Sequence, residues 1–197
     1  MLNPDEQQAL LTWYDQHHRP LPWRATSDPW AILLSEVLLQ QTQVSRGLVF
    51  WERMLATFPR IQDMASSDVD EVLKAWEGAG YYSRARRLHA LSQRVMASST
   101  EGGTDGTLPS SASALLTLPG VGPYTAAAVA SIAHGEAVAC VDGNIRRVMA
   151  RRTASLNPKP AEVQKWADES LHHDRPGDWN QALMELGATV CTPKKTQ

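Results

Sequence analysis

The sequence contains few cysteines, no long apolar run and no excess of charge of either sign. Two cysteines among 197 residues, Cys140 and Cys191, are too few for a disulfide framework and fit a reducing compartment better. No stretch approaches the ~20 apolar residues of a membrane span, and the first residues lack the basic and apolar regions of a secretory signal. Nineteen basic against twenty-one acidic residues give a net charge of −2, so bulk charge points to no polyanionic partner. We expect a soluble cytoplasmic protein with no signal segment and no membrane partner.

Alternating apolar and polar residues, the pattern of half-buried strands, are nearly absent, and only residues 137–141 fit it. Apolar residues recur instead at helical spacing, and turn signals such as Asn157-Pro158 separate the segments. The sequence therefore predicts an all-α fold. The predicted helices cover residues of about 5–17, 29–38, 45–57, 68–77, 83–97, 111–117, 123–134, 143–152, 160–172 and 178–190.

A glycine-containing turn joins two predicted helices at residues 118–126 (Leu-Pro-Gly-Val-Gly-Pro-Tyr-Thr-Ala). Gly120 and Gly122 allow positive φ angles and let the backbone approach a ligand closely. The helix that follows directs its free N–H groups and positive dipole end into the same space, which suits an anion such as a phosphate. A lone Gly-x-Gly would favour a tight turn between two packed helices, whereas the length of the whole run favours phosphate binding.

Two carboxylates occur in settings that favour opposite protonation states. Glu36 shares a predicted helix face with Ile32 and Leu33, and apolar surroundings should raise its pKa towards neutrality. Such a group can act as a general acid, although it could also reach solvent or pair with an arginine. Asp142, followed by Gly143, begins a predicted helix, where it caps the helix or presents an ionised carboxylate. A protonated acid beside an ionised carboxylate suits glycosidic bond cleavage.

Basic residues cluster locally even though the total charge is balanced. Five bases and one acid lie between Asp142 and Lys159, and Arg84, Arg86 and Arg87 follow the aromatic turn at 80–82. An aromatic side chain on a glycine corner beside arginines can wedge into a base stack while the arginines hold phosphates. The alternative is a solvated helix face with the tyrosines packed in the core.

Together these segments resemble the catalytic domain of MutY-type adenine DNA glycosylases, within the endonuclease III-like helix-hairpin-helix superfamily. The resemblance extends over almost the whole chain. The residues that carry it are 35–42 (Ser-Glu-Val-Leu-Leu-Gln-Gln-Thr), 78–86 (Gly-Ala-Gly-Tyr-Tyr-Ser-Arg-Ala-Arg), 118–125 (Leu-Pro-Gly-Val-Gly-Pro-Tyr-Thr) and 141–144 (Val-Asp-Gly-Asn). It implies repair of double-stranded DNA by excision of adenine mispaired with 8-oxoguanine or guanine, after the adenine is flipped out of the helix.

The fold implied by the resemblance has two helical lobes with the adenine pocket between them. Residues 28–134 would form a six-helix barrel, with the helix-hairpin-helix at about 111–134. Residues 1–27 and 135–197 would form the second lobe from both ends of the chain. We expect a monomer, associated with the nucleoid if the protein is bacterial.

The resemblance also implies residue roles. Glu36 matches the general acid that protonates adenine at N7, Asp142 the carboxylate that stabilises the cationic sugar, and Asn144 a polar group beside them. Tyr124 falls where bifunctional relatives carry a Schiff-base lysine, so imine chemistry has no amine at that position. Gln41 and Tyr81 match residues that enter the duplex. The DNA-binding residues implied as a set are Gln41, Thr42, Tyr81, Arg84, Gly120, Val121, Gly122 and Thr125.

The family carries a 4Fe-4S cluster held by four cysteines. Cys191 matches the first of them, and the sequence ends at Gln197, before the second would come. A single thiolate cannot hold such a cluster, so we expect that this chain does not bind one by itself. The family's carboxyl-terminal domain, which helps to recognise 8-oxoguanine, is likewise outside this sequence, so relative to the family we expect a chain truncated at its carboxyl end.

Two other functions stay open beside adenine excision. One is a DNA-binding remnant of the enzyme that no longer catalyses the reaction, which would bind duplexes in a salt-sensitive way without releasing adenine. The other is an endonuclease III-like glycosylase for oxidised pyrimidines, against which Tyr124 and Glu36 both argue.

Overall fold

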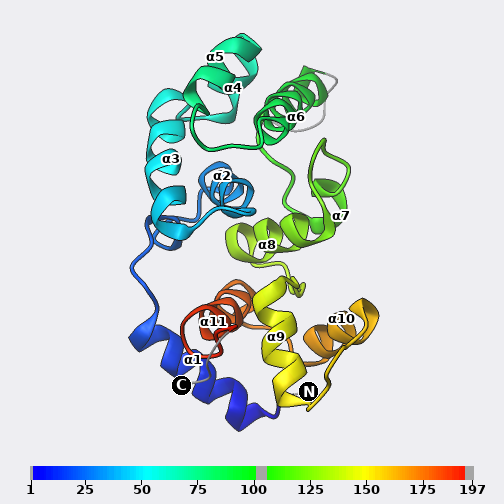
Figure 1. Cartoon of the computed structure of the whole chain (residues 1–197). Helices are drawn as coiled ribbons and strands as arrows, with labels where there is room; N and C mark the ends of the chain where they lie inside the picture. Colours follow the sequence, from blue (N-terminus) through cyan, green and yellow to red (C-terminus); the bar gives the residue numbers. More distant parts are fainter. Residues whose placement is uncertain (1, 101–105, 194–197) are drawn as a thin grey trace.

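The computed structural model describes residues 2–100 and 106–193, and every regular element in these ranges is a helix, as predicted. Figure 1 shows two groups of helices, one formed by α2 to α8 and the other by α1 and α9 to α11. In chain order the elements are α1 (Pro4–His17), the 3-10 turn η1 (Pro22–Arg24), α2 (Pro29–Leu39), α3 (Val44–Thr57), α4 (Ile61–Ser66), α5 (Val69–Ala75), α6 (Ser83–Thr100), α7 (Ala112–Leu115), α8 (Pro123–His134), α9 (Gly143–Arg152), α10 (Pro160–Glu169) and α11 (Pro176–Thr189).

The helix α4 lies in a segment where the sequence pattern predicts none. It has only six residues, too few for a periodic pattern, and it follows directly after Pro59. Its first turn is held by Asp63, whose carboxylate accepts hydrogen bonds from the Arg60 main-chain N–H at 2.9 Å and from the Arg60 guanidinium. The strand considered at residues 137–141 is irregular backbone instead. No described helix is long and apolar enough to cross a membrane.

The helix α2 forms the centre of the first core. All nine of its residues from Trp30 to Leu38 are buried, and α3 and α8 pack on it. Two tryptophans fix these contacts through their indole N–H groups, because Trp51 of α3 donates to the Ala31 carbonyl at 2.8 Å and Trp30 donates to the Phe58 carbonyl at 2.9 Å. A buried helix has no solvated face, so any polar residue on α2 is forced into the interior.

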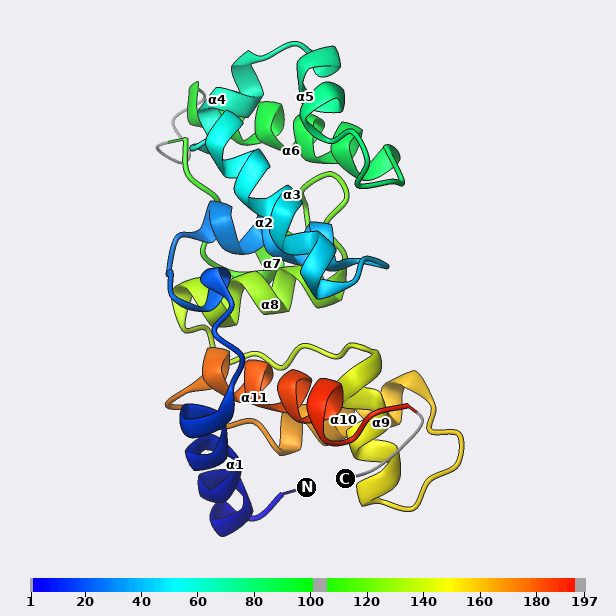
Figure 2. The same ribbon diagram turned by 60° about the vertical axis from the view of Figure 1, so that its left-hand side comes forward.

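The second core brings together both ends of the chain. The helix α1 packs against α11, and α9 packs against α10 and α11, as Figure 2 also shows. Their buried side chains include two large aromatics, Trp166 and Trp179, together with Ile145 and Leu183. The predicted lobe boundaries, residues 28–134 for one lobe and both chain ends for the other, stay a prediction.

The alanine-rich helix α8 contributes to both cores. Val129 and Ala130 belong to the first core, whereas Ala127 and Ala128 belong to the second. Small side chains let α11 approach α8 closely at Gly177, where an added Cβ would lie 2.6 Å from the Ser131 carbonyl oxygen. The helix α8 therefore fixes the spacing between the two groups of helices.

A buried ion pair fastens the segment between α1 and α2 to α11. The Glu185 carboxylate is fully buried and accepts from the Arg19 guanidinium at 2.7 Å and from Arg24 at 2.8 Å. It also accepts from the Arg19 main-chain N–H at 3.0 Å. Burial by itself raises the pKa of Glu185, but the hydrogen bonds from both arginines outweigh it and lower the pKa to about 2.

Substitution of Gly177 by alanine should destabilise the protein. The new Cβ would meet main-chain atoms of Ser131 and Ile132, which cannot swing away as a side chain can. We expect the free energy of unfolding in urea to fall by about 1–3 kcal/mol. Gly143→Ala is the matched control, because its Cβ would meet no atom within 4 Å and should change stability by less than about 1 kcal/mol. Equal stability of the two variants would contradict the close packing of α8 and α11.

Substitution of Glu185 by glutamine should cost about 3 kcal/mol of unfolding free energy, because it leaves the buried Arg24 guanidinium without a counter-charge, whereas the partly exposed Arg19 keeps contact with water. The exposed pair between Asp15 and Arg175 provides the control, and Asp15→Asn should cost at most about 1 kcal/mol. The wild-type contribution of Glu185 is complete above pH ~4.5, the ordinary pKa of a glutamate, and disappears as the pH falls through about 2. Urea titrations between pH 2 and 7 measure both effects, and a pH-independent difference between wild type and Glu185→Gln would refute the ion pair.

Candidate active site

A cavity of about 660 Å³ opens between the two groups of helices. Polar side chains reach it from α2 and the turn after it, from the start of α8, from the start of α9, from α11 and from the segment before α2. These polar lining residues are Arg19, Arg24, Ser35, Glu36, Gln40, Gln41, Thr42, Tyr124, Asp142, Asn144, Gln181 and Glu185. The structure therefore brings the predicted residues Glu36, Tyr124, Asp142 and Asn144 to one cavity, although 106 positions separate Glu36 from Asp142 in the chain.

Glu36 is 8% exposed and lies on the cavity side of α2. Burial raises the pKa of its carboxyl to about 7, and the charge of Asp142 adds to the rise. A hydrogen bond with the Tyr124 hydroxyl and the charge of Arg24 oppose the rise without cancelling it. The predicted pKa near neutrality is thus confirmed for this carboxyl, and Glu36 can hold or release a proton at physiological pH.

Asp142 is the N-cap of α9, and both of its carboxylate oxygens are hydrogen-bonded. One accepts from the Ile145 main-chain N–H at 2.8 Å, and the other accepts from the Asn144 side-chain amide at 2.7 Å. The sequence left helix capping and presentation of an ionised carboxylate as alternatives. The structure shows that Asp142 caps α9 and that the capping carboxylate also lines the cavity.

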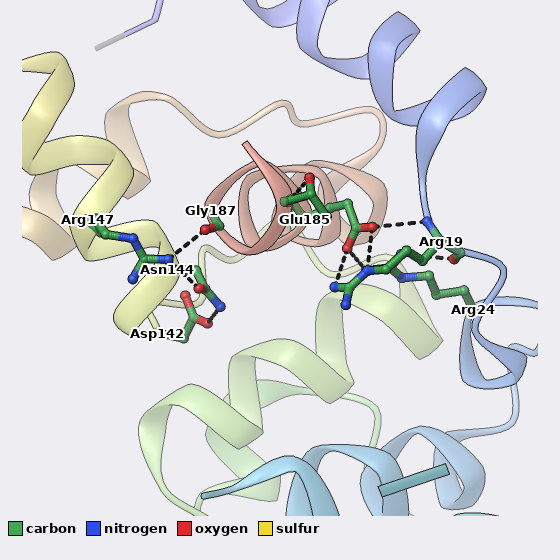
Figure 3. A network of polar contacts seen from close by, with 8 residues as sticks. Arg19, Arg24, Asp142, Asn144, Arg147, Glu185 and Gly187 are labelled. Carbon is green, nitrogen blue, oxygen red and sulfur yellow. Dashed lines mark hydrogen bonds and ion pairs between the residues drawn. The ribbon is translucent and has the colours of Figure 1, made fainter. Parts of the chain in front are cut away.

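Arg147, one turn along α9, sets the direction of the Asn144 amide. Its guanidinium donates to the Asn144 side-chain oxygen at 2.7 Å and to the Gly187 carbonyl at 2.6 Å (Figure 3). It also donates to the Cys191 carbonyl at 2.6 Å. Since the amide oxygen faces a cation, the amide NH₂ must face Asp142. The sequence analysis considered Arg147 only as part of a basic cluster, and its partners, up to 44 positions away, leave no local signal.

Asn180 of α11 holds the irregular segment that leads into Asp142. Its amide nitrogen donates to the Ser131 hydroxyl and to the Val138 carbonyl, each at 2.9 Å, and its oxygen accepts from the Cys140 main-chain N–H at 3.2 Å. The side chain is 1% exposed. One buried amide thus joins α8, α11 and the backbone before Asp142, and the sequence analysis did not identify it.

Tyr124, in the first turn of α8, presents its phenol to the cavity. The hydroxyl donates to the Met184 sulfur at 3.2 Å. Burial raises the pKa of the phenol well above its ordinary value, and the charge of Glu36 raises it further. Tyr124 is therefore a neutral hydroxyl beside Glu36 rather than a nucleophile.

The ion pair of Glu185 with Arg19 and Arg24 also lines the cavity (Figure 3). The sequence analysis did not name these three residues. The signal available was a pair of arginines around Leu21-Pro22-Trp23, but their carboxylate partner lies more than 160 positions away, so the pairing could not be read from the sequence.

Of the two glycines in the turn before α8, only Gly120 uses the positive φ that glycine permits, with an angle of +79°. Gly122, the N-cap of α8, has an ordinary φ of −95°. An added Cβ at Gly122 would meet no atom within 4 Å, so open space faces the turn there. Val121 and Thr125 are buried, and the Thr125 hydroxyl accepts from Gln40 at 3.4 Å. These two residues can meet a ligand only through their main-chain atoms.

Four other predicted DNA-binding residues lie in two turns of the α2–α8 group. Gln41 and Tyr81 are exposed and have positive φ angles of 60° and 48°, and Thr42 is half-buried at the cavity. Arg84 is only 8% exposed, and its guanidinium donates to main-chain carbonyls of the protein itself. Contact of these residues with DNA stays a prediction, and for Arg84 the structure adds an intramolecular role.

The cysteines of this chain do not fit a 4Fe-4S cluster. Such a cluster needs four thiolates, whereas the sequence has two cysteines. Cys140 is buried in the second core, and the Cys191 sulfur accepts from the Arg151 guanidinium at 3.1 Å. Among the described residues, no three His, Cys, Asp or Glu side chains gather as ligands for a metal ion.

Comparison with known proteins identifies the family of the chain. Residues 34–172 match the family model described as HhH-GPD superfamily base excision DNA repair protein. The chain is 44% identical to the adenine DNA glycosylase of Homo sapiens, a match over 95% of this chain and 36% of that protein. It is 39% identical to that of Mycobacterium tuberculosis, over 94% of this chain and 61% of the relative. The chain thus spans about a third to three fifths of the length of these curated relatives.

Solved structures show the same architecture. A thermostable thymine-DNA glycosylase is 30% identical with a TM-score of 0.85, a match over 96% of this chain and 88% of that one. A trapped endonuclease III–DNA covalent intermediate is 20% identical with a TM-score of 0.77, over 100% and 92% of the two chains, and supports the fold alone. The family model covers more than half of the sequence. The chain therefore belongs to the HhH-GPD superfamily of base excision DNA repair proteins.

Proposed function

We propose that this chain removes adenine from double-stranded DNA by hydrolysing its N-glycosidic bond, where the adenine lies opposite 8-oxoguanine or guanine. The observation that carries the proposal is a buried carboxyl with a pKa of about 7, Glu36, in one cavity with the hydrogen-bonded carboxylate of Asp142. Similarity to adenine DNA glycosylases from human to bacterial sources supports adenine as the base.

In this proposal Glu36 is the general acid. Its proton passes to N7 of the adenine while the bond between N9 and the sugar carbon C1′ breaks and its electron pair leaves with the base. The positive charge that develops on the sugar is stabilised by the Asp142 carboxylate, which Asn144 holds in place. Water then adds to C1′ and gives a proton to the Glu36 carboxylate, which leaves an abasic site, free adenine and Glu36 protonated again.

The DNA would approach the α2–α8 group. A base inside a duplex cannot reach a closed cavity, so the adenine must be flipped out of the stack. The turn at Gly120 and Gly122, with the N-terminus of α8 behind it, suits a backbone phosphate on the same side. The exposed side chains of Gln41 and Tyr81 would enter the duplex that the adenine leaves.

A lyase reaction on oxidised pyrimidines is less well supported. Schiff-base chemistry needs an amine within reach of C1′. Tyr124 takes that position in the resemblance, and no lysine among the described residues lines the cavity. We therefore propose a monofunctional hydrolase.

Removal of either carboxylate should abolish the reaction. Glu36→Gln keeps the shape but cannot donate the proton, and Asp142→Asn removes the charge that faces the sugar. We expect each to lower the single-turnover rate on a duplex with one adenine opposite 8-oxoguanine by at least ~100-fold. Excess protein is mixed with end-labelled duplex, and strand cleavage is read after hot alkali. Glu52→Gln, an exposed position on α3, is the control.

Several outcomes would contradict this assignment. A near-native single-turnover rate of adenine release in Glu36→Gln or Asp142→Asn would show that the substituted residue does not have the proposed role. Wild-type protein that binds the duplex without releasing adenine is the DNA-binding remnant instead. A covalent adduct with DNA that borohydride can trap would point to the lyase.

The single-turnover rate of adenine release should also fall as the pH rises. Because Glu36 must carry a proton, and its pKa is about 7, the single-turnover rate should fall about tenfold for each pH unit above ~7. Duplex affinity measured at each pH is the control for lost binding. A flat rate from pH 6 to 9 would refute Glu36 as the acid.

A further inference from the structure

Arg84 is a buried arginine whose guanidinium is surrounded by main-chain carbonyls. It lies in the first turn of α6, and 8% of the residue is exposed. Its two terminal nitrogens donate to two separate segments of the chain. One nitrogen donates to the carbonyls of Val37 (2.9 Å), Leu38 (3.1 Å) and Gln40 (2.6 Å), and the other to those of Ala79 (3.2 Å) and Gly80 (3.3 Å).

The first set of carbonyls belongs to the end of α2. The last four carbonyls of a helix have no partner within it and need a donor from elsewhere. The helix α2 ends at Leu39, and no glycine follows to form the usual cap. The Arg84 guanidinium supplies the donors for these carbonyls and so fixes the path of the chain from α2 into residues 40–42.

The second set belongs to the turn between α5 and α6. Other contacts hold this turn as well, because the Trp76 indole N–H donates to the Gly80 carbonyl at 2.9 Å and Arg46 donates to the Gly78 carbonyl at 2.6 Å. The Arg84 guanidinium also lies over the rings of Trp76 and Tyr81, at 5.3 and 5.5 Å from their centroids. Arg84 is therefore the residue shared by the two turns, which lie on one side of the α2–α8 group (Figure 2).

Each turn contains a non-glycine residue in the left-handed region, Gln41 with φ 60° and Tyr81 with φ 48°. Such conformations cost free energy and persist only where neighbouring contacts hold them. The peptide carbonyl directly before each of these residues, that of Gln40 and that of Gly80, is a partner of Arg84. Rotation of either peptide plane would change the φ angle that follows it, so Arg84 holds both strained residues through the peptides that precede them.

We propose that Arg84 is a positioning residue that holds Gln41 and Tyr81 at a fixed separation for insertion into one duplex. This inference rests on the proposed function, which makes both side chains duplex-inserting groups. Gln41 is exposed at the cavity, and Tyr81 is 63% exposed although it is aromatic. Arg84 itself faces inward, so its role is exerted through these two residues and not through a phosphate.

The geometry requires arginine rather than a positive charge alone. The planar guanidinium presents N–H groups in several fixed directions and reaches five carbonyls, whereas a lysine ammonium has three donors at a single point. Arg84→Lys should therefore behave like Arg84→Met, a substitution that keeps an unbranched apolar stem and removes the donors.

Equilibrium binding tests the inference. All proteins carry Glu36→Gln, so that no adenine is released, and bind fluorescent duplexes with a central adenine opposite either 8-oxoguanine or thymine. The readout is the ratio of the two dissociation constants. Arg84→Met and Arg84→Lys should each lower this preference about tenfold. Arg94→Met removes the same charge from an exposed position of the same helix and should leave the preference unchanged.

A double-mutant comparison separates positioning from general damage to the fold. In a background of Gln41→Ala and Tyr81→Ala, Arg84→Met should change the preference less than ~2-fold, because the groups through which it acts are gone. An equal loss in both backgrounds would overturn the inference. So would a wild-type preference in Arg84→Lys, or an equal weakening on both duplexes, which is the result for a phosphate ligand.

This binding test and the test of the proposed function can fail separately. The proposed function is tested by adenine release from protein in which Glu36 is restored. If the chain prefers the lesion duplex but releases no adenine, only the proposed function fails. If it releases adenine and Arg84→Met leaves the preference intact, only the role of Arg84 fails. A chain with no preference for the lesion duplex would overturn the role of Arg84 as well.

Discussion

The packing of α8 between two cores is the constraint on which the site depends. Its alanines and Val129 are buried towards both groups of helices, so neither group can move relative to the other without exposing apolar surface. The helix α2 packs on one side of α8, and α11 packs on the other at the close contact of Gly177. Glu36 and Asp142, which lie on different sides of this helix, therefore reach one cavity at a spacing that main-chain packing sets.

The cavity keeps Glu36 protonated because the nearby cations are engaged elsewhere. Arg24 lowers the pKa of Glu36, but only weakly compared with the rise caused by burial. Its guanidinium forms a 2.8 Å ion pair with the fully buried Glu185, which Arg19 joins. A neighbouring cation favours the ionised form of a carboxylate. With Arg24 paired to Glu185, burial stays the largest influence on the pKa of Glu36.

A sequence pattern indicates the role of a residue when the residues that surround it in the fold are also close to it in the chain. Glu36 could be identified because the apolar residues around it lie on the same helix, and Asp142 because a cap is defined by the few residues that follow it. Arg24, Arg147 and Asn180 each have a partner 40 to 161 positions away, which no pattern near them in the sequence indicates. The six-residue α4 was missed for a related reason, since it is too short for a periodic pattern. Arg84 was predicted to hold a phosphate because the sequence does not show that an arginine is buried.

The proposed function divides chemistry and recognition between different parts of the fold. The two carboxyls of the cavity come from both groups of helices, whereas the glycine turn, Gln41 and Tyr81 all belong to the α2–α8 group. Substitutions in the contact between α9 and α11, such as at Gly187, where a Cβ would lie 2.5 Å from the Asn144 Cβ, act on Asp142 and not on the duplex-facing turns. Substitutions at Arg84 act on those turns and leave both carboxyls in place. Under the proposed function the two kinds of defect differ, because the first reaches the reaction through the orientation of Asn144 and the second through the two peptides that precede Gln41 and Tyr81.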